Sequence, residues 1–139
     1  MSDERVRAVM VRYYEEIWNQ GRLEVCDELI APDYVNHSAP LPSLPPGPAG
    51  LKQIVAAMRR AFPDLHYTIE DLVLGGDKAA LRTTLRGTHR GEFCGVAPTG
   101  RTVEVQELQI EHLRDGQIVA HWHLIDEQGL QRQLGLLPH

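Results

Sequence analysis

The spacing of apolar residues changes near Asp64, and this change constrains the fold more than any other feature of the sequence. Before Asp64, apolar side chains recur every three or four residues, which is the period of a helix with one buried face. After Asp64 they alternate with polar side chains, which is the period of a strand with one buried face. Most helices therefore precede the strands. This order predicts an α+β fold in which helices pack on one face of a strongly bent antiparallel sheet.

Three helical segments are expected before Asp64. The first begins behind Ser2, which suits an N-cap, and stops at Asn19-Gln20-Gly21, where glycine can adopt a left-handed conformation. A shorter helix ends at Pro32, and a third covers residues 50–62. Five prolines between residues 40 and 48 are incompatible with both helix and strand, so we expect a surface loop there.

The long strand after Gly100 changes its apolar side part-way along. Val103 and Val105 are odd-numbered, whereas Leu108 and Ile110 are even-numbered, so the apolar face changes near residues 106–107. A β-bulge is the simplest cause, because a bulge re-aims the side chains that follow it. Bulges are also common beside active sites.

The length of 139 residues matches the commonest size of one domain, and we find neither an internal repeat nor a linker. We therefore expect a single domain over residues 1–139. Apolar residues make up 42% of the chain and charged residues 24%, which is ordinary for a globular protein and too apolar for disorder.

Charge and hydropathy argue against several classes of partner. The net charge is -5, and no run of Lys or Arg could follow a phosphate backbone, so we expect no nucleic acid partner. No stretch approaches the ~18 apolar residues of a membrane span, and residues 1–12 lack the apolar core of a signal peptide. We expect a cytoplasmic protein. Cys26 and Cys94 lack a C-x-x-C spacing, which favours free thiols.

Asp126 is the first candidate for chemistry. It ends an apolar row on one face of the last strand, and an apolar surround favours the neutral form of a carboxyl group, which suits it to proton transfer. The other members of that row are Ile118, Ala120, Trp122 and Leu124. The alternative is that Asp126 caps the terminal helix, because Asp is a preferred N-cap.

Two further pairs are candidates for substrate binding. Glu107 and Gln109 lie beside the expected bulge and could line a cavity; the alternative is a strand surface that faces solvent. Asn36 and His37 end a short strand that follows Tyr34, where an amide and an imidazole could polarise a carbonyl group. The alternative is an ordinary turn, in which Asn is common.

His121-Trp122-His123 with Glu127 gives H-x-H-x-x-x-E, which is close to the metal motif of the cupins. Two imidazoles and a carboxylate would suit iron, manganese or zinc. A cupin needs further strands and another histidine after this motif, however, and only twelve residues follow Glu127. We therefore expect no metal here and interpret the two histidines as surface or packed residues.

Short motifs in order along almost the whole chain resemble the SnoaL-like polyketide cyclase family. The main run contains Arg86-Gly87-Thr88-His89, Gly91-Glu92-Phe93, Gly95 and Pro98-Thr99-Gly100. The others are Asn19-Gln20-Gly21, Pro32 to His37, Phe62-Pro63-Asp64, His121-Trp122 with Asp126, and Gln133-Leu134-Gly135. Each motif is weak alone, but together they are specific.

The resemblance implies the nuclear-transport-factor-two-like fold, a cone of curved antiparallel sheet closed by N-terminal helices around an apolar pocket. It also implies that Asp126 is the general acid/base for intramolecular aldol ring closure of a polyketide ester, without metal or organic cofactor. Asn36 would be a pocket amide and Trp122 an aromatic wall of the pocket. The substrate would be a small hydrophobic carbonyl compound, and an open sheet face would form a homodimer or a higher homo-oligomer.

The chain departs from the family pattern on the penultimate strand. Characterised cyclases carry a Gln and a His two residues apart there, where this chain has Glu107 and Gln109. Isomerisation of a carbonyl compound is therefore a related possibility. The alternative from another class is a non-catalytic domain of the same fold that binds a small molecule or a protein.

Overall fold

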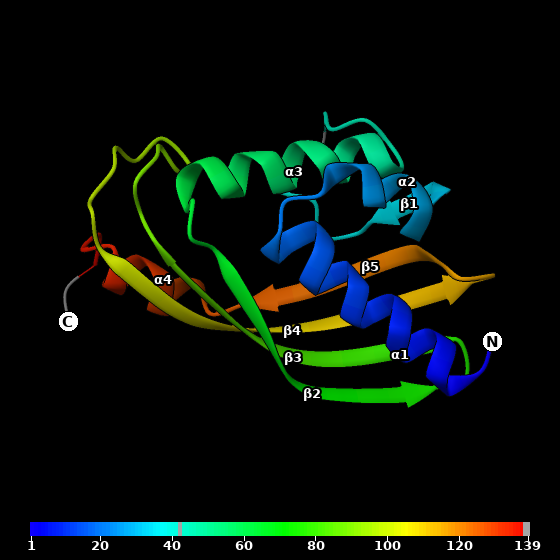
Figure 1. The fold of residues 1–139 in the computed structure, drawn as a ribbon. Coiled ribbons are helices and arrows are strands. Elements are labelled where there is room, and N and C mark those ends of the chain that lie inside the picture. The colour runs from blue at the N-terminus through cyan, green and yellow to red at the C-terminus, as the bar shows by residue number, and fades with distance from the viewer. Residues whose placement is uncertain (42, 138–139) are drawn as a thin grey trace.

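A computed structural model describes residues 1–41 and 43–137, and it contains one curved five-stranded sheet (Figure 1). The strands are β1 (Ile30–Asn36), β2 (His66–Gly75), β3 (Lys78–Thr88), β4 (Thr102–Arg114) and β5 (Gln117–Ile125). Their order in the sheet is β1-β5-β4-β3-β2, with β1 parallel to β5 and every other pair antiparallel.

The N-terminal helix changes its winding half-way along. The α-helix α1 (Asp3–Arg12) starts at Ser2, whose Oγ accepts a hydrogen bond from the Arg5 N–H at 3.1 Å. The chain then continues as a π-helical segment, η1 (Tyr13–Asn19), before Gly21 adopts a left-handed φ of 70°. The expected helix and its glycine stop are confirmed, but the change from α to π winding was not visible in the spacing.

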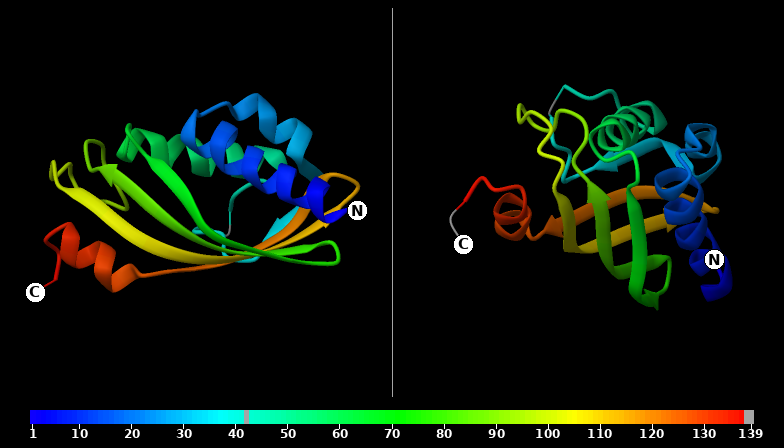
Figure 2. Two further views of the ribbon diagram at one scale, coloured as in Figure 1. Left: turned by 60° about the horizontal axis from the view of Figure 1, so that its bottom comes forward. Right: turned by 60° about the vertical axis from the view of Figure 1, so that its left-hand side comes forward.

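Three further segments complete the helical part of the fold. A 3₁₀ turn, η2 (Leu23–Val25), leads into α2 (Cys26–Leu29), and α3 (Pro48–Ala61) follows the proline-rich loop. The last helix is α4 (Glu127–Gln133). In the two views of Figure 2, the N-terminal helices and α3 cover the concave face of the sheet, while α4 lies at the end of β5.

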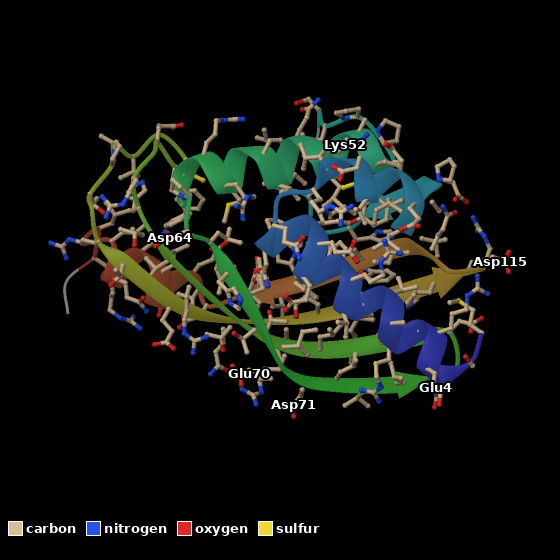
Figure 3. The ribbon with its side chains drawn as sticks, in the orientation of Figure 1. Glu4, Lys52, Asp64, Glu70, Asp71 and Asp115 are labelled. Carbon is tan, nitrogen blue, oxygen red and sulfur yellow. The ribbon has the colours of Figure 1, made fainter. Side chains whose placement is uncertain are left out.

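The core lies between these helices and the concave face. Buried side chains of the N-terminal helix and α3 pack against those of β2 to β5. Most charged side chains lie at the periphery, where Lys52 pairs with Asp27 at 2.8 Å and Arg82 pairs with Asp71 at 2.8 Å (Figure 3). The expected α+β architecture with helices on one face of a bent sheet is confirmed.

The bulge expected near residues 106–107 was wrong. β4 pairs with β3 in unbroken register from Thr102 to His112, and every odd-numbered side chain from Val103 to Leu113 is buried. The register irregularity lies instead on β5, where Ala120 pairs with His112 but Ile118 pairs with Leu113, which leaves Val119 as the extra residue. The pattern was misleading because β4 carries polar residues on its inner face and apolar residues on its outer face.

Within residues 1–41 and 43–137, we find no helix with the length and hydropathy needed to cross a membrane.

Candidate active site

A cavity of about 410 Å³ lies between the concave face of the sheet and the covering helices. This volume falls in the range of small-molecule sites. The lining is mostly apolar and aromatic, and it comes from η1, α3, the strands, the 89–101 loop and α4. Its principal members are Tyr13, Tyr14, Trp18, Leu51, Ile54, Met58, Phe62, Tyr67, Leu85, Phe93, Glu107, His121, His123, Ile125 and Leu130.

The π-helical segment supplies one aromatic wall of this cavity. Its winding brings residues five apart together, and the Trp18 side chain accordingly hydrogen-bonds the hydroxyl of Tyr13. The rings of Tyr14 and Trp18 each lie 5.2 Å from the ring of Tyr67 on β2. Short π-helical segments are frequent at functional sites.

Glu107 on β4 places a carboxylate in these apolar surroundings. Its side chain is buried, and the Tyr67 hydroxyl donates a hydrogen bond to it. Within the described part of the chain, its second oxygen, Oε2, has no hydrogen-bond partner. Burial raises the pKa of Glu107, and the Tyr67 hydrogen bond and nearby His121 only partly oppose this. A carboxyl with a raised pKa in a cavity is a typical general acid/base.

A row of three polar side chains, Glu111, His121 and His123, lies on the same face of the sheet. The buried Glu111 Oε1 contacts Nδ1 of His121, and Nε2 of His121 lies 2.8 Å from Nδ1 of His123. Burial raises the pKa of Glu111, opposed by His121. Burial, together with the neighbouring His121, lowers the pKa of His123 to about 4. His123 is therefore neutral near physiological pH.

Ser38 fixes the end of β1 beside these histidines. Its Oγ accepts a hydrogen bond from the His123 N–H at 2.9 Å and donates one to the His123 carbonyl at 3.2 Å. Asn36 lines the cavity next to it, and its Oδ1 accepts a hydrogen bond from the Ser38 N–H at 2.9 Å. The amide NH₂ of Asn36 is therefore the group that remains to donate to a ligand.

Two of the predicted site residues, Asn36 and Glu107, line the cavity. Gln109 is buried on the same sheet face, but its Nε2 donates to Thr83 Oγ1 at 2.8 Å, and it lies beneath the cavity lining. Tyr34 is also buried, and it lines a neighbouring hollow of about 280 Å³ under the proline-rich loop.

The structure places the other three predicted residues outside the cavity. The rings of His37 and Trp122 stack on each other at 4.4 Å, against the outer face of the sheet. Asp126 is exposed, and its Oδ1 accepts a hydrogen bond from the Gly129 N–H at 2.9 Å, as in an N-cap of α4. This corrects the expected faces of β5 after its register irregularity, because His121, His123 and Ile125 face inward whereas Trp122, Leu124 and Asp126 do not. Ile118, which precedes the irregularity, is buried in the core.

Sequence reasoning missed the role of Glu111, and it weighed His121 and His123 as metal ligands before interpreting them as surface or packed residues. In residues 1–41 and 43–137, no three His, Cys, Asp or Glu side chains are grouped so as to hold a metal ion. The signal that could have found the cluster is polar spacing of two on both paired strands, at residues 107, 109 and 111 and at residues 121 and 123.

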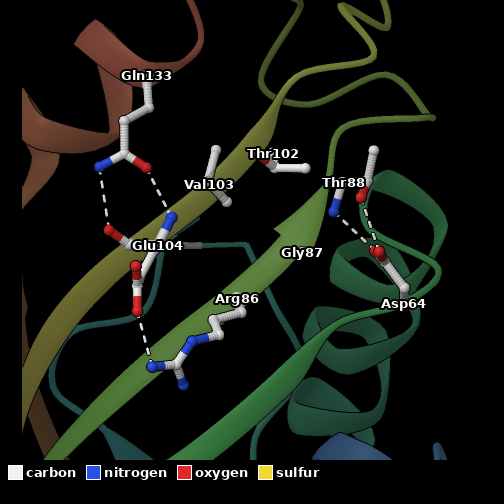
Figure 4. Close-up of a pocket in the computed structure, with 8 residues that line it drawn as sticks. All are labelled: Asp64, Arg86, Gly87, Thr88, Thr102, Val103, Glu104 and Gln133. Atoms are coloured by element: carbon white, nitrogen blue, oxygen red, sulfur yellow. Dashed lines mark hydrogen bonds and ion pairs between the residues drawn. The ribbon is translucent and has the colours of Figure 1, made fainter.

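A second, more open hollow of about 540 Å³ lies near the start of β4 (Figure 4). Its polar groups bond one another: Asp64 accepts from the N–H and the hydroxyl of Thr88, both at 2.7 Å. Gln133 of α4 is paired with the backbone of Glu104 at 2.6 and 3.0 Å, and Arg86 bridges to the Glu104 carboxylate at 2.7 Å. The Gln133 contacts tie α4 to the sheet, and the other polar groups are paired with one another, so we interpret this hollow as structural.

The family model for SnoaL-like polyketide cyclases matches residues 8–134. The chain belongs to this family. It is 32% identical over 127 residues to aklanonic acid methyl ester cyclase AcmA of Streptomyces galilaeus, which covers 90% of this chain and 88% of the relative. It is 31% identical over 120 residues to nogalonic acid methyl ester cyclase of Streptomyces nogalater, and this match covers 85% of this chain and 89% of the relative.

Solved structures agree with the family. TsrD from Streptomyces laurentii superposes with a TM-score of 0.90 at 31% identity, covering 99% of both chains. IdmH from Streptomyces antibioticus superposes with a TM-score of 0.81 at 39% identity, covering 94% of this chain and 98% of that one. Since the family model is that of polyketide cyclases and the relatives from Streptomyces galilaeus and Streptomyces nogalater are ester cyclases, this SnoaL-like protein is an enzyme of the cyclase class.

Proposed function

We propose that this cyclase closes a ring in a polyketide methyl ester by an intramolecular aldol reaction, with Glu107 as the general acid/base and without a cofactor. The observation that supports this most is the buried carboxylate of Glu107, which lines an otherwise largely apolar cavity. The named relatives act on aklanonic acid methyl ester and nogalonic acid methyl ester. These two esters are therefore the first substrates to try.

The proposed first step is removal of a proton from the carbon beside a carbonyl group. Glu107 Oε2 takes the proton, and the C–H electron pair forms an enolate, whose oxygen accepts a hydrogen bond from the Asn36 amide NH₂. Burial keeps the Glu107 pKa above its ordinary value, so the carboxylate is a stronger base than an exposed one. Positioned proton transfer of this kind contributes about 10²- to 10⁴-fold to the rate.

The proposed second step forms the ring. The enolate carbon attacks a second carbonyl carbon of the same molecule, and the electron pair of that C=O moves onto oxygen, which takes up a proton. The aromatic wall of Tyr13, Tyr14 and Trp18 supports this step, because apolar surroundings keep water from protonating the enolate first.

The competing hypothesis, implied by the family resemblance, places the base at Asp126. Turnover of aklanonic acid methyl ester by Glu107→Gln and Asp126→Asn separates the two. We expect Glu107→Gln to lose about 10²- to 10⁴-fold in kcat with little change in KM, and Asp126→Asn to keep its turnover. The reverse result would assign the base to Asp126. Tight binding of both esters without turnover by the wild type would support a non-catalytic binding domain instead.

We also propose a homodimer formed through the outer face of the sheet. Leu108, Ile110 and Leu124 are 56%, 49% and 76% exposed there, and a contiguous apolar patch on a sheet face is typical of an interaction surface. The cytoplasmic location and the absence of a metal, an organic cofactor and a nucleic acid partner stay predictions. Metal analysis of untagged protein tests the expected absence of a metal. Light scattering tests the proposed homodimer.

A further inference from the structure

We propose that Glu111, His121 and His123 form a proton relay that ends at Nε2 of His123 and supplies the proton to the oxygen formed on ring closure. This inference rests on the proposed aldol function and adds a second proton-transfer group to it. Glu107 would remove the proton from carbon, and the relay would deliver a different proton to oxygen.

The geometry of the relay is a continuous line from the core to the cavity. Glu111 is fully buried on β4 and contacts Nδ1 of His121, the residue paired with it on β5. Nε2 of His121 then lies 2.8 Å from Nδ1 of His123. Because His121 occupies Nδ1 of His123, the other ring nitrogen, Nε2, is the one available to a ligand in the cavity.

The hydrogen-bond partners fix the proton positions in the protonated relay. Nδ1 of His121 and Glu111 share one proton, and Nε2 of His121 carries a second, which it donates to Nδ1 of His123. Neutral His123 then carries its own proton on Nε2. Whichever atom of the Glu111–His121 pair holds the shared proton, the relay presents an N–H donor to the cavity.

Removal of one proton reverses the direction of the hydrogen bond between His121 and His123. Glu111 is then a carboxylate that accepts from Nδ1–H of His121, whose Nε2 becomes an acceptor. His123 must donate its Nδ1–H to that acceptor, which leaves Nε2 without a proton. The relay thus exchanges one proton with the cavity while His123 stays neutral in both states.

The electrostatics favour placing the extra proton on the Glu111–His121 pair rather than on His123. Burial and His121 together lower the pKa of His123 to about 4, so His123 does not hold the positive charge itself. The extra proton lies instead within the Glu111–His121 pair, whose two side chains are in direct contact. The other titratable groups that face this cluster are the buried hydroxyls of Tyr13, Tyr14 and Tyr34, whose pKa burial raises, and the carboxyl of Glu107.

The proton count of the reaction then balances. Glu107 gains the proton that the substrate carbon loses, and the new alkoxide takes the proton from Nε2 of His123. In the same step the proton on Nε2 of His121 moves to Nδ1 of His123, and His121 becomes neutral. Exchange with water returns the proton of Glu107 to the relay, so substrate and product are isomers and the enzyme is unchanged.

The two proton-transfer groups are close enough to serve one substrate. Glu107 pairs with Ile125 and Gln109 pairs with His123, so Glu107 and His123 are diagonal neighbours on the inner face. Diagonal side chains on paired strands are about 7–8 Å apart, which spans the reacting carbon and the carbonyl oxygen of an aldol ring closure. The two hydrogen bonds between Ser38 and the His123 backbone hold the strand in this position.

The decisive measurement is the tautomer of His123, read from imidazole ¹⁵N chemical shifts as a function of pH. We expect the proton of His123 to move from Nε2 to Nδ1 as the pH rises and the Glu111–His121 pair loses its extra proton. Glu111→Gln should shift this exchange to lower pH, because the carboxylate no longer stabilises the proton on His121. A His123 whose tautomer does not change while His121 titrates would overturn the relay.

Kinetics give an independent readout with aklanonic acid methyl ester. Wild-type kcat should fall at low pH as Glu107 becomes protonated and fall at high pH as the relay loses its proton. His123→Gln should lower kcat at least about tenfold and remove the high-pH fall, while Glu111→Gln should move that fall to lower pH. His66→Gln, which removes an exposed imidazole from β2, is the control and should leave the profile unchanged.

The two proposals fail in different ways. If Glu107→Gln is inactive while His123→Gln keeps the wild-type rate and pH profile, the relay is wrong and the aldol function stands. If the wild type cyclises neither ester, the proposed function is wrong. The ¹⁵N titration then decides the relay alone: a coupled tautomer exchange supports it, and independent titration of the two histidines overturns it.

Discussion

The two faces of β4 reverse the usual distribution of polar and apolar residues. On the inner face Glu107, Gln109 and Glu111 are buried, whereas on the outer face Leu108 and Ile110 are half exposed. Burying a polar group costs free energy unless its hydrogen bonds are satisfied, and exposing an apolar patch leaves a surface that a partner can cover. The inner face therefore indicates chemistry, and the outer face indicates assembly.

The inner face is not fully satisfied, which strengthens this interpretation. Within residues 1–41 and 43–137, one oxygen each of Glu107, Gln109 and Glu111 has no hydrogen-bond partner. Each such group costs about 1–3 kcal/mol of stability. A face selected only for stability would carry apolar residues at these positions, so we expect substitutions there to separate stability from function.

The largest expected effect comes from making the catalytic part of the inner face apolar. Tyr67→Phe combined with Glu107→Leu removes both partners of one hydrogen bond, so neither is left unsatisfied. We expect kcat to fall about 10²- to 10⁴-fold, while the free energy of unfolding stays the same or rises. Turnover assays and urea denaturation of the purified variant measure the two quantities.

The matched control is the neighbouring polar pair, Thr83 and Gln109, which lies on the same face beneath the cavity lining. Thr83→Val combined with Gln109→Leu should leave turnover near the wild-type rate and should not lower the free energy of unfolding. If this control loses as much activity as the Tyr67 and Glu107 pair, the whole inner face is required and Glu107 has no special role.

The second prediction concerns the outer face. Leu108 and Leu124 lie directly opposite each other on β4 and β5, so a glutamate at Leu124 places a charge at the centre of the expected dimer contact. We expect Leu124→Glu to raise the dimer dissociation constant about tenfold or more without loss of cavity chemistry per chain. Analytical ultracentrifugation measures this. Val11→Glu, at an exposed apolar residue of α1, is the control.

A wild-type protein that is monomeric at micromolar concentration would contradict the assembly part of the comparison, whatever the variants do. The polar inner face would then still indicate chemistry. The exposed leucines would need another explanation.

Much of the fold could be predicted from the sequence because periodicity reports burial directly. The helical spacing before Asp64 and the alternation after it gave the helices, the strands and the stop at Gly21 correctly. The inner face of β4 could not be predicted in this way. An alternation rule assumes that buried means apolar, so Leu108 and Ile110 were assigned inward and the reversal was interpreted as a bulge.

The same assumption misplaced part of the candidate site. Trp122 and Asp126 were assigned to the pocket face because the row that contains them is apolar, yet His121 and His123 are the residues that face the cavity. Glu107 was chosen because it lies beside the expected bulge and Asn36 because it ends a short strand, and both line the cavity although the bulge itself was wrong. The Glu111 contact depends on strand register, which no single-strand pattern contains.

The third prediction is a pH dependence of stability with opposite signs for two inner residues. The pKa of Glu107 is raised by burial above 4.5, so its contribution to stability is fully present below about pH 4.5 and is lost as the pH rises through the raised value. The pKa of His123 is lowered from 6.5 to about 4, so its contribution is present above 6.5 and is lost as the pH falls towards about 4.

Urea unfolding over this pH range in two variants tests the assignment. Glu107→Gln should remove part of the loss of stability at higher pH, and His123→Gln should remove part of the loss below pH 6.5. If both variants change the stability in the same pH range, the surroundings described for one of these two groups in the cavity are wrong.

The smallest expected effect is at Asp126, which lies outside the cavity at the start of α4. Its Oδ1 accepts the Gly129 N–H, and Asn caps a helix about as well as Asp, so Asp126→Asn should change neither stability nor turnover measurably. Asp126→Ala removes the cap and should cost about 1 kcal/mol of unfolding free energy while kcat at saturating ester stays near the wild-type value. Loss of turnover in Asp126→Asn at unchanged stability would show that this exposed carboxylate takes part in the reaction. Catalytic residues would then not be confined to the inner face of the sheet, because Asp126 lies outside the cavity, between β5 and α4.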